Sequence, residues 1–182
     1  MAERRSALRG IRSGERVRIV ELPGRTLVHV LAFHGRRGAA EDTLEEAIGL
    51  RPPGVVGQTS EDGERRILCV GPGRWWVVEV EPARVQLDTA LGAVVDQSHG
   101  RTVIEVQGAA VRELLAKGTS IDLHPKIFPA GACAATTLAQ IAVVLESRAD
   151  DRIEIHVPRS YTRALFDWLE DAALEFEGTA SA

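Results

Sequence analysis

The sequence predicts an α+β fold built from two fused βαββαβ units of the ferredoxin-like type. The order strand, helix, strand, strand, helix, strand can be traced once in the first half of the chain and again in the second. With 182 residues, 45% of them apolar and 26% charged, the chain can bury a core in both units. We expect a flexible basic arm at 1–15, a first unit at 16–100, a second unit at 101–178 and a tail at 179–182.

The first unit is expected to open with two strands, 16–22 and 25–33, separated by a turn at Pro23-Gly24. A short amphipathic helix follows at 40–50, because its apolar residues recur three and four positions apart. The proline pair after this segment cannot continue a helix and is expected to end it.

The middle of the chain predicts a hairpin and a further helix. Strands at 67–70 and 75–80 flank the loop Gly71-Pro72-Gly73-Arg74, whose composition is typical of a tight connection between strands. Pro82 then has the position expected of the first residue of a helix. The residues expected on the inner face of this helix are Leu87, Ala90 and Leu91.

The second unit repeats the pattern. A strand at 101–106 precedes a helix at 109–117, which Gly118 is expected to close in a left-handed conformation. A hairpin is predicted from 140–146 and 152–157, and apolar and polar residues alternate in its second strand, as in a sheet covered on one face. The apolar residues are Ile153, Ile155 and Val157, and the polar residues are Arg152, Glu154 and His156.

The last helix is expected to begin at Ser160, a candidate N-cap, and to end near Gly178. Its apolar residues recur at helical spacing, as on the inner face of a packed helix. They are Leu165, Trp168, Leu169, Ala172 and Phe176. Because such an aromatic stripe is typical of core packing rather than of a cofactor site, we expect Trp168 to be mostly buried.

The composition of the chain excludes several classes of function. The net charge of -4 argues against nucleic acid as the main partner, because phosphate binding needs a positive face. The chain has no apolar run of about eighteen residues and no cleavable leader, so we expect a cytoplasmic protein that does not span a membrane. Cys69 and Cys133 form no CxxC pair and are expected to be reduced, buried fillers.

The sequence contains few residues arranged for chemistry. It has no GxGxxG, Walker A or HExxH motif and no Cys/His cluster, so neither a nucleotide site nor a metal site is expected. Asp96, Ser98 and His99 lie too close in sequence for a catalytic triad and are better explained by a turn. His124, two residues after Asp122, is expected to be a turn histidine, with a ligand or interface contact as the alternative. No catalytic residue is assigned.

The second half of the chain resembles the gamma subunit of heterotetrameric sarcosine oxidase, strongly over 96–176. The segments that carry the resemblance are Arg101–Gly118, Ile121–Pro125, Phe128–Ala134 and Ser160–Leu169. Over 25–95 the resemblance is weaker and depends mainly on the turn and strand Gly71–Trp76, and the first fifteen residues show none.

A more distant resemblance links Asp96–Arg101 to the folate-binding aminomethyltransferase of the glycine cleavage system, which implies that family's fold of fused βαββαβ units. That family carries an acidic residue beside the reacting folate nitrogen. The corresponding residues here are Ile141 and Ala142, which can neither donate a proton nor stabilise a cation. We therefore expect the folate chemistry to be lost, and we assign no cofactor-binding residue.

The stronger resemblance implies a four-chain flavoenzyme that oxidatively demethylates sarcosine to glycine, using oxygen and tetrahydrofolate. In that family the alpha subunit is understood to hold NAD and the folate site, and the beta subunit holds FAD, FMN and the amine site. The gamma chain has no assigned chemistry. We therefore expect a non-catalytic chain that binds no cofactor itself and acts in assembly and stability with alpha, beta and delta subunits.

The alternative is a stand-alone folate-binding transferase, which would need an acidic residue and a ring-stacking aromatic in a central cavity. The chain has only eight aromatic residues, and several of them are expected in the core, so we favour the subunit interpretation. Partner contacts are expected in the basic arm and in the loop 123–128, whose apolar residues lie between prolines and are hard to bury in regular structure. The candidates are Arg4, Arg5, Arg9, Arg12, His124, Ile127 and Phe128.

Overall fold

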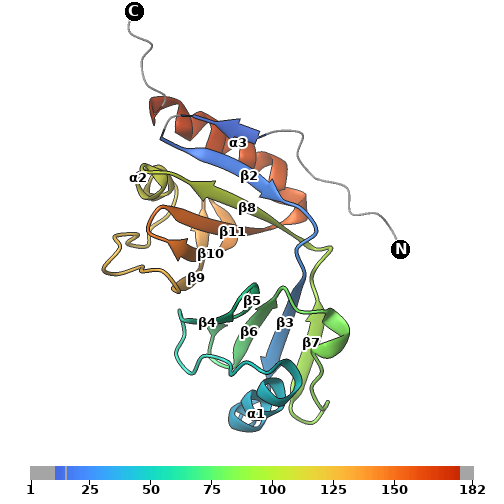
Figure 1. Ribbon diagram of the computed structural model, residues 1–182. Coiled ribbons are helices and arrows are strands. Elements are labelled where there is room, and N and C mark those ends of the chain that lie inside the picture. Colours follow the sequence, from blue (N-terminus) through green and yellow to red (C-terminus); the bar gives the residue numbers. More distant parts are fainter. Residues whose placement is uncertain (1–10, 15, 177–182) are drawn as a thin grey trace, which may run out of the picture. The chain divides into compact units, whose positions relative to one another are not determined.

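The computed structural model of the chain describes residues 11–14 and 16–176. It divides into two compact units, which we call the middle unit, Gly24–Gly100, and the split unit, Met1–Pro23 together with Arg101–Ala182. The predicted α+β class is confirmed, since each unit is an antiparallel sheet with few helices (Figure 1). None of the helices in the described part of the chain is long and apolar enough to cross a membrane.

The middle unit has a five-stranded sheet in the order β4-β5-β6-β3-β7. Its elements are β3 (Leu27–Ala32), α1 (Arg37–Ile48), β4 (Thr59–Asp62), β5 (Arg65–Gly71), β6 (Arg74–Val78), the 3-10 helix η1 (Pro82–Arg84) and β7 (Gly92–Asp96). Strands β5, β6, β3 and β7 have the order of a βαββαβ unit, and β4 extends it at one edge. The predicted hairpin across Pro72-Gly73 is confirmed, with Gly73 at φ 62°.

The core of the middle unit lies between one face of this sheet and α1. The helix contributes Ala40, Leu44 and Ile48, which are spaced to share one face. The helix ends at Gly49 in a left-handed conformation, φ 77°, three residues before the proline pair that was expected to end it. The buried strand residues on this face are Val28, Val30, Ile67, Cys69, Trp75 and Val77.

The prediction of a helix from Pro82 is wrong beyond the first turn, because the structure has only the 3-10 helix η1 there. The side chain of Asp88 accepts a hydrogen bond from the Ala90 N–H at 2.8 Å, and this local bond competes with a helix. Ala90 is exposed, and Leu87 is half-buried against the core. The segment leads into β7, which the sequence analysis missed.

The split unit has a six-stranded sheet in the order β1-β2-β8-β11-β10-β9. Its strands are β1 (Ile11–Ser13), β2 (Arg18–Leu22), β8 (Arg101–Gln107), β9 (Cys133–Leu138), β10 (Ile141–Ala149) and β11 (Arg152–Pro158). Its helices are α2 (Val111–Ala116), the 3-10 helix η2 (Arg159–Tyr161), α3 (Thr162–Ala173) and the 3-10 helix η3 (Leu174–Phe176).

Strand β2 belongs to the split unit and not to the unit at 16–100 that was expected to contain it. It pairs along its length with β8, from Arg18 opposite Gln107 to Leu22 opposite Val103 (Figure 1). Ile19 is fully buried in the core of the split unit, and this burial favours the distant partner over the next strand in sequence. Strand β2 therefore takes the place of the fourth strand that would follow α3 in a continuous βαββαβ unit.

One face of the split unit's sheet forms a core with α2 and α3. The strand residues predicted to face inward are buried in it, namely Ile153, Ile155 and Val157. The opposite face was predicted to be solvated, but Glu154 is 3% exposed and His156 is fully buried. The prediction of a sheet covered on one face is therefore wrong for the middle of β11.

The contact between α2 and α3 gives Gly118 a role that the sequence analysis did not predict. Gly118 is not left-handed, but a Cβ atom at this residue would lie 2.5 Å from Cη2 of Trp168. Trp168 is half-buried and packs against the core, so it is less buried than expected. Ser160 lies in η2, and α3 begins without a side-chain cap; Gly178 lies outside the described residues.

Candidate functional site

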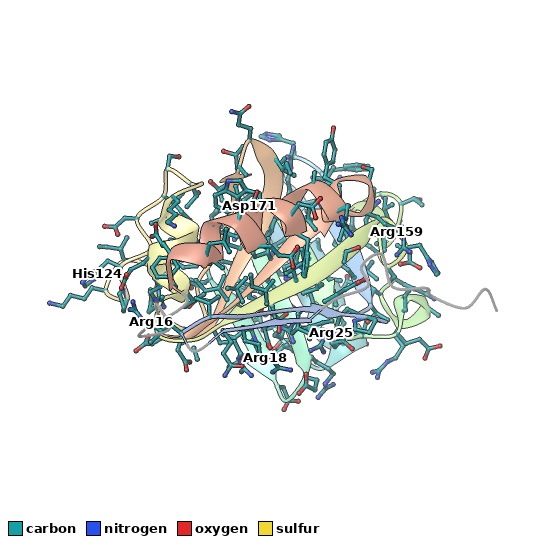
Figure 2. All side chains as sticks on the ribbon, turned by 90° about the horizontal axis from the view of Figure 1, so that it is seen from above. Arg16, Arg18, Arg25, His124, Arg159 and Asp171 are labelled. Carbon is teal, nitrogen blue, oxygen red and sulfur yellow. The ribbon has the colours of Figure 1, made fainter. Side chains whose placement is uncertain are left out.

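The loop between α2 and β9 contains the residues that were predicted to contact a partner. Asp122 accepts a hydrogen bond from the His124 N–H at 2.8 Å, and Nδ1 of His124 accepts one from the Lys126 N–H at 3.2 Å. His124 thus has the predicted turn role, and its exposed ring lies at the outer end of this loop (Figure 2). Ile127 is 65% exposed, although it is apolar.

Phe128 corrects the expectation for this loop. Its side chain is only 5% exposed and packs in the core of the split unit. The N–H groups of Ile127 and Phe128 both donate to the carbonyl of His124, so a short turn directs adjacent side chains to opposite sides. Phe128 therefore anchors the loop, and Ile127 remains a candidate contact residue.

Arg112 on α2 fixes the shape of this loop, and the sequence analysis did not identify it. Its side chain is 13% exposed; Nε donates to the Asp150 carbonyl at 2.8 Å, and Nη1 donates to the Phe128 carbonyl at 2.8 Å. Nη1 also donates to the carbonyl of Leu123. A single guanidinium thus joins the loop to the turn between β10 and β11, because its donors diverge in a plane.

The basic arm is described only in part. Arg4, Arg5 and Arg9 lie outside the described residues, and Arg12 is described as part of the backbone of β1. Arg16 follows the arm, lies 3.8 Å from the Glu113 carboxylate and stands 5.7 Å from the ring centre of Phe176. Figure 2 shows Arg16 and Arg18 on the split unit, where both are exposed.

Glu146, Glu154 and His156 form a buried cluster that the sequence analysis missed. Their potential ligand atoms lie within 4.8 Å of one another, which is a geometry that could hold a metal ion. His156 Nε2 lies 3.0 Å from one oxygen of Glu146, and Nη1 of Arg148 lies 3.1 Å from the other. Nε of Arg148 also lies 3.8 Å from Glu154. Since Arg148 supplies positive charge to both carboxylates, we interpret the cluster as an internal ion network.

The signal for this cluster was present in the sequence as Glu154 and His156 two positions apart, which places them on one face of a strand. Their partner Glu146 comes from the neighbouring strand, and the register that brings it opposite Glu154 depends on the length of the hairpin. The alternation of apolar and polar residues in β11 predicts a solvated face here, and a cluster of buried charges is not expected on such a face.

Asp96 and Ser98 form a turn, as predicted. The Ser98 N–H donates to Asp96 Oδ1 at 2.9 Å, and the hydroxyl of Ser98 accepts a hydrogen bond from the Leu27 N–H at 3.0 Å. His99, the third residue of the rejected triad, is exposed. These contacts use the two polar side chains to connect the end of β7 to β3.

Both cysteines are buried, as predicted, and neither forms a disulfide in the part of the chain that the structure describes. Burial raises the pKa of the Cys69 thiol, which favours its neutral, unreactive form. Ile141 and Ala142, which replace the acidic residue of the folate enzymes, begin β10, where Ile141 is half-buried and Ala142 is exposed.

The fold of the chain is similar to that of a known class of proteins. The chain is similar to the glycine cleavage system aminomethyltransferase T from Bartonella henselae, with a TM-score of 0.58 at 13% sequence identity, covering 85% of this chain and 45% of that chain. At this identity the likeness shows the fold alone. The protein is thus an α+β protein of the aminomethyltransferase fold.

A family model described as "Sarcosine oxidase, gamma subunit family" matches residues 38–175. The chain belongs to this family. It is 34% identical to the sarcosine oxidase subunit gamma of Corynebacterium sp. (strain P-1) over 167 residues, which cover 88% of this chain and 81% of the relative. It is 31% identical to that of Corynebacterium sp. (strain U-96) over 179 residues, with coverages of 93% and 86%.

A solved structure supports the same assignment. A chain in the heterotetrameric sarcosine oxidase from Corynebacterium sp. U-96, in complex with pyrrole 2-carboxylate, matches with a TM-score of 0.84 and 30% identity. The match covers 93% of this chain and 90% of that chain, so the likeness extends over both units.

Proposed function

We propose that this chain is the gamma subunit of a heterotetrameric sarcosine oxidase and that it contributes surfaces rather than chemistry to the complex. The observation that carries the proposal is the TM-score of 0.84, over nine-tenths of both chains, with a chain of that complex. The partners would be alpha, beta and delta subunits, in a cytoplasmic complex that oxidatively demethylates sarcosine to glycine.

The positions of the polar residues support a non-catalytic role. Asp96, Ser98 and His124 make turn contacts, and Glu146 and His156 belong to a buried ion network. Groups engaged in this way are poorly placed to move protons on a substrate. FAD, FMN, NAD and tetrahydrofolate would accordingly be held by the other chains.

The loop held by Arg112 is well suited to assembly. Its shape is fixed by hydrogen bonds to the carbonyls of Leu123 and Phe128, while Ile127 projects with 65% of its surface exposed. A preorganised loop binds with a smaller loss of conformational entropy than a mobile one. We propose that Ile127 and His124 contact a partner subunit, together with the arm that contains Arg4, Arg5, Arg9 and Arg12.

Co-expression with the candidate alpha, beta and delta chains of the same organism tests the proposal. The chain should co-elute with a yellow, flavin-containing complex that consumes oxygen when sarcosine is added. The purified chain alone should show no turnover. Elution apart from the flavin-bearing chains would contradict the proposal, and transfer of a one-carbon unit to tetrahydrofolate by the isolated chain would support a stand-alone transferase instead.

A further inference from the structure

Three polar side chains hold the loop between α2 and β9, and they differ in how they respond to pH. Arg112 donates to two carbonyl groups of the loop. Asp122 accepts the His124 N–H at 2.8 Å, and Nδ1 of His124 accepts the Lys126 N–H at 3.2 Å. Guanidinium and carboxylate groups generally keep their charge above about pH 5, whereas imidazole groups generally titrate between about pH 5 and 8. Of these three side chains, His124 is therefore the one that responds to protons near neutral pH.

The hydrogen bond from Lys126 determines which ring nitrogen of His124 carries the proton. A nitrogen that accepts a hydrogen bond has no proton of its own, so the neutral ring has its proton on Nε2. Protonation of Nδ1 converts the acceptor into a donor that faces the Lys126 N–H, and two donors cannot bond each other. The bond is thus present while His124 is neutral and is lost when the pH falls and the ring becomes charged.

The charged groups around this turn do not restore the bond. Lys126 adds positive charge to the same loop, and Arg112 adds positive charge from α2, which packs against it. The carboxylates are Asp122 within the turn and Asp150, which lies 3.7 Å from the Arg112 guanidinium. Attraction of the charged ring to Asp122 would draw it away from the Lys126 N–H, so this attraction also opens the turn.

The same bond bears on the residue that the loop exposes. Ile127 follows Lys126 directly, is 65% exposed, and donates its N–H to the His124 carbonyl at 2.8 Å. The segment 126–127 is therefore held by one bond to the ring of His124 and one bond to its backbone. Loss of the ring bond leaves this segment less ordered before binding, which weakens binding through conformational entropy.

We propose that the tip of this loop is a proton-sensitive switch for assembly. Neutral His124 holds the segment that presents Ile127, and protonation releases this segment and weakens its contact with a partner subunit. The inference concerns the regulation of the proposed assembly surface and rests on the proposed function, because it requires a partner chain at this loop. Loss of one hydrogen bond of this kind changes an equilibrium constant by about threefold to tenfold.

A matched pair of substitutions tests the switch in the full-length chain co-expressed with the candidate alpha, beta and delta chains. His124→Asn places an amide oxygen near the position of Nδ1, where it can accept the same bond without titrating. His34→Asn removes an exposed histidine of the middle unit and is the control. The ratio of the dissociation constants at about pH 5.5 and about pH 8 should be about threefold to tenfold larger for the wild type and His34→Asn than for His124→Asn. Analytical ultracentrifugation measures these constants.

The outcomes separate this inference from the proposed function. If the wild type does not assemble at about pH 8, where histidine is neutral, both fail. Equal ratios for the wild type and His124→Asn overturn the inference alone. Tighter assembly of the wild type at the lower pH also overturns it, because this result would indicate an ion pair between the charged ring and a carboxylate of the partner.

Nuclear magnetic resonance of the isolated, full-length chain tests the turn without a partner. At about pH 8 the chemical shifts of the ring nitrogens of His124 should show the proton on Nε2. The amide resonance of Lys126 should then move together with the titration of this ring. A proton on Nδ1 of the neutral ring, or a Lys126 amide that does not follow the titration, would contradict the switch even if the complex assembles.

Discussion

Four strands of each sheet have the same βαββαβ order, but the two sheets differ on the face turned away from the helices. In the middle unit this face has Leu68 opposite Trp76, with His29 and the buried Arg66 beside them. In the split unit the corresponding face has Glu146 opposite Glu154, and Glu154 in turn opposite Glu105. Like charges that face each other across strands destabilise a sheet, so the second arrangement depends on compensating groups such as Arg148. The order of the strands therefore does not dictate the chemistry of the second face.

The two units also differ in which segments of the chain supply their strands. The middle unit takes its strands from one continuous segment, whereas the split unit takes β2 from the start of the chain. The units should therefore respond differently to cutting the chain and to changes on the second face.

Cutting the chain should have the largest effect. Residues 24–100 expressed alone should fold and unfold cooperatively, whereas residues 101–176 alone should not fold, because they lack the buried Ile19 and leave the edge of β8 open. Circular dichroism and thermal unfolding measure both.

A joined chain is the control for this experiment. Leu22 lies opposite Val103, so a short glycine-rich linker can connect Pro23 to Arg101 as a hairpin. This joined chain should fold. If residues 101–176 also folded without β2, the split unit would not depend on a strand from the start of the chain, and the predicted difference between the units would be wrong.

Removing the compensating cation should have the next largest effect. Arg148→Ala leaves the carboxylates of Glu146 and Glu154 buried with less positive charge, and should lower the free energy of unfolding by about 3–5 kcal/mol. Urea denaturation measures this. Arg163→Ala removes an exposed pair with Asp167 and should cost less than about 1 kcal/mol. Equal effects would mean that the second face of the split unit does not depend on its ions.

Gly118 tests the packing of α3 on the split unit. Gly118→Ala should lower the free energy of unfolding by about 1–3 kcal/mol, because the added methyl group overlaps the ring of Trp168. In the double variant with Trp168→Leu, the further cost of Gly118→Ala should be smaller, and a double-mutant cycle measures this coupling. Strictly additive effects would show that the two residues do not compete for space.

The smallest effect is expected in the hairpin between β9 and β10. Ala139 and Gln140 have positive φ values of 49° and 65°, a conformation that costs energy for residues other than glycine. Ala139→Gly should raise the free energy of unfolding by about 0.5–1 kcal/mol. Ala142→Gly in β10 should lower it by a similar amount, since glycine weakens a strand. Thermal unfolding of both variants compares them.

Local sequence was sufficient for features that depend on near neighbours. The hairpin at Pro72-Gly73 and the turn at Asp96 and Ser98 were predicted because their residues determine the local backbone. The alternation in β11 identified Ile153 and Ile155 as core residues, since period two shows which residues share a face. The family was also recognisable from motifs in the second half of the chain, and the comparisons confirmed it.

The tertiary structure alone decided the features that depend on distant segments. The alternation of side chains along a strand assigns Glu154 and His156 to one face, but it does not show whether that face is exposed to solvent. A helix pattern does not show that Arg112 reaches the carbonyls of a later loop, or that Phe128 turns inward while Ile127 turns outward. The choice of β8 as the partner of β2 likewise depends on where Ile19 can be buried. Each of these follows from burial and pairing between residues far apart in sequence, which local propensities do not encode.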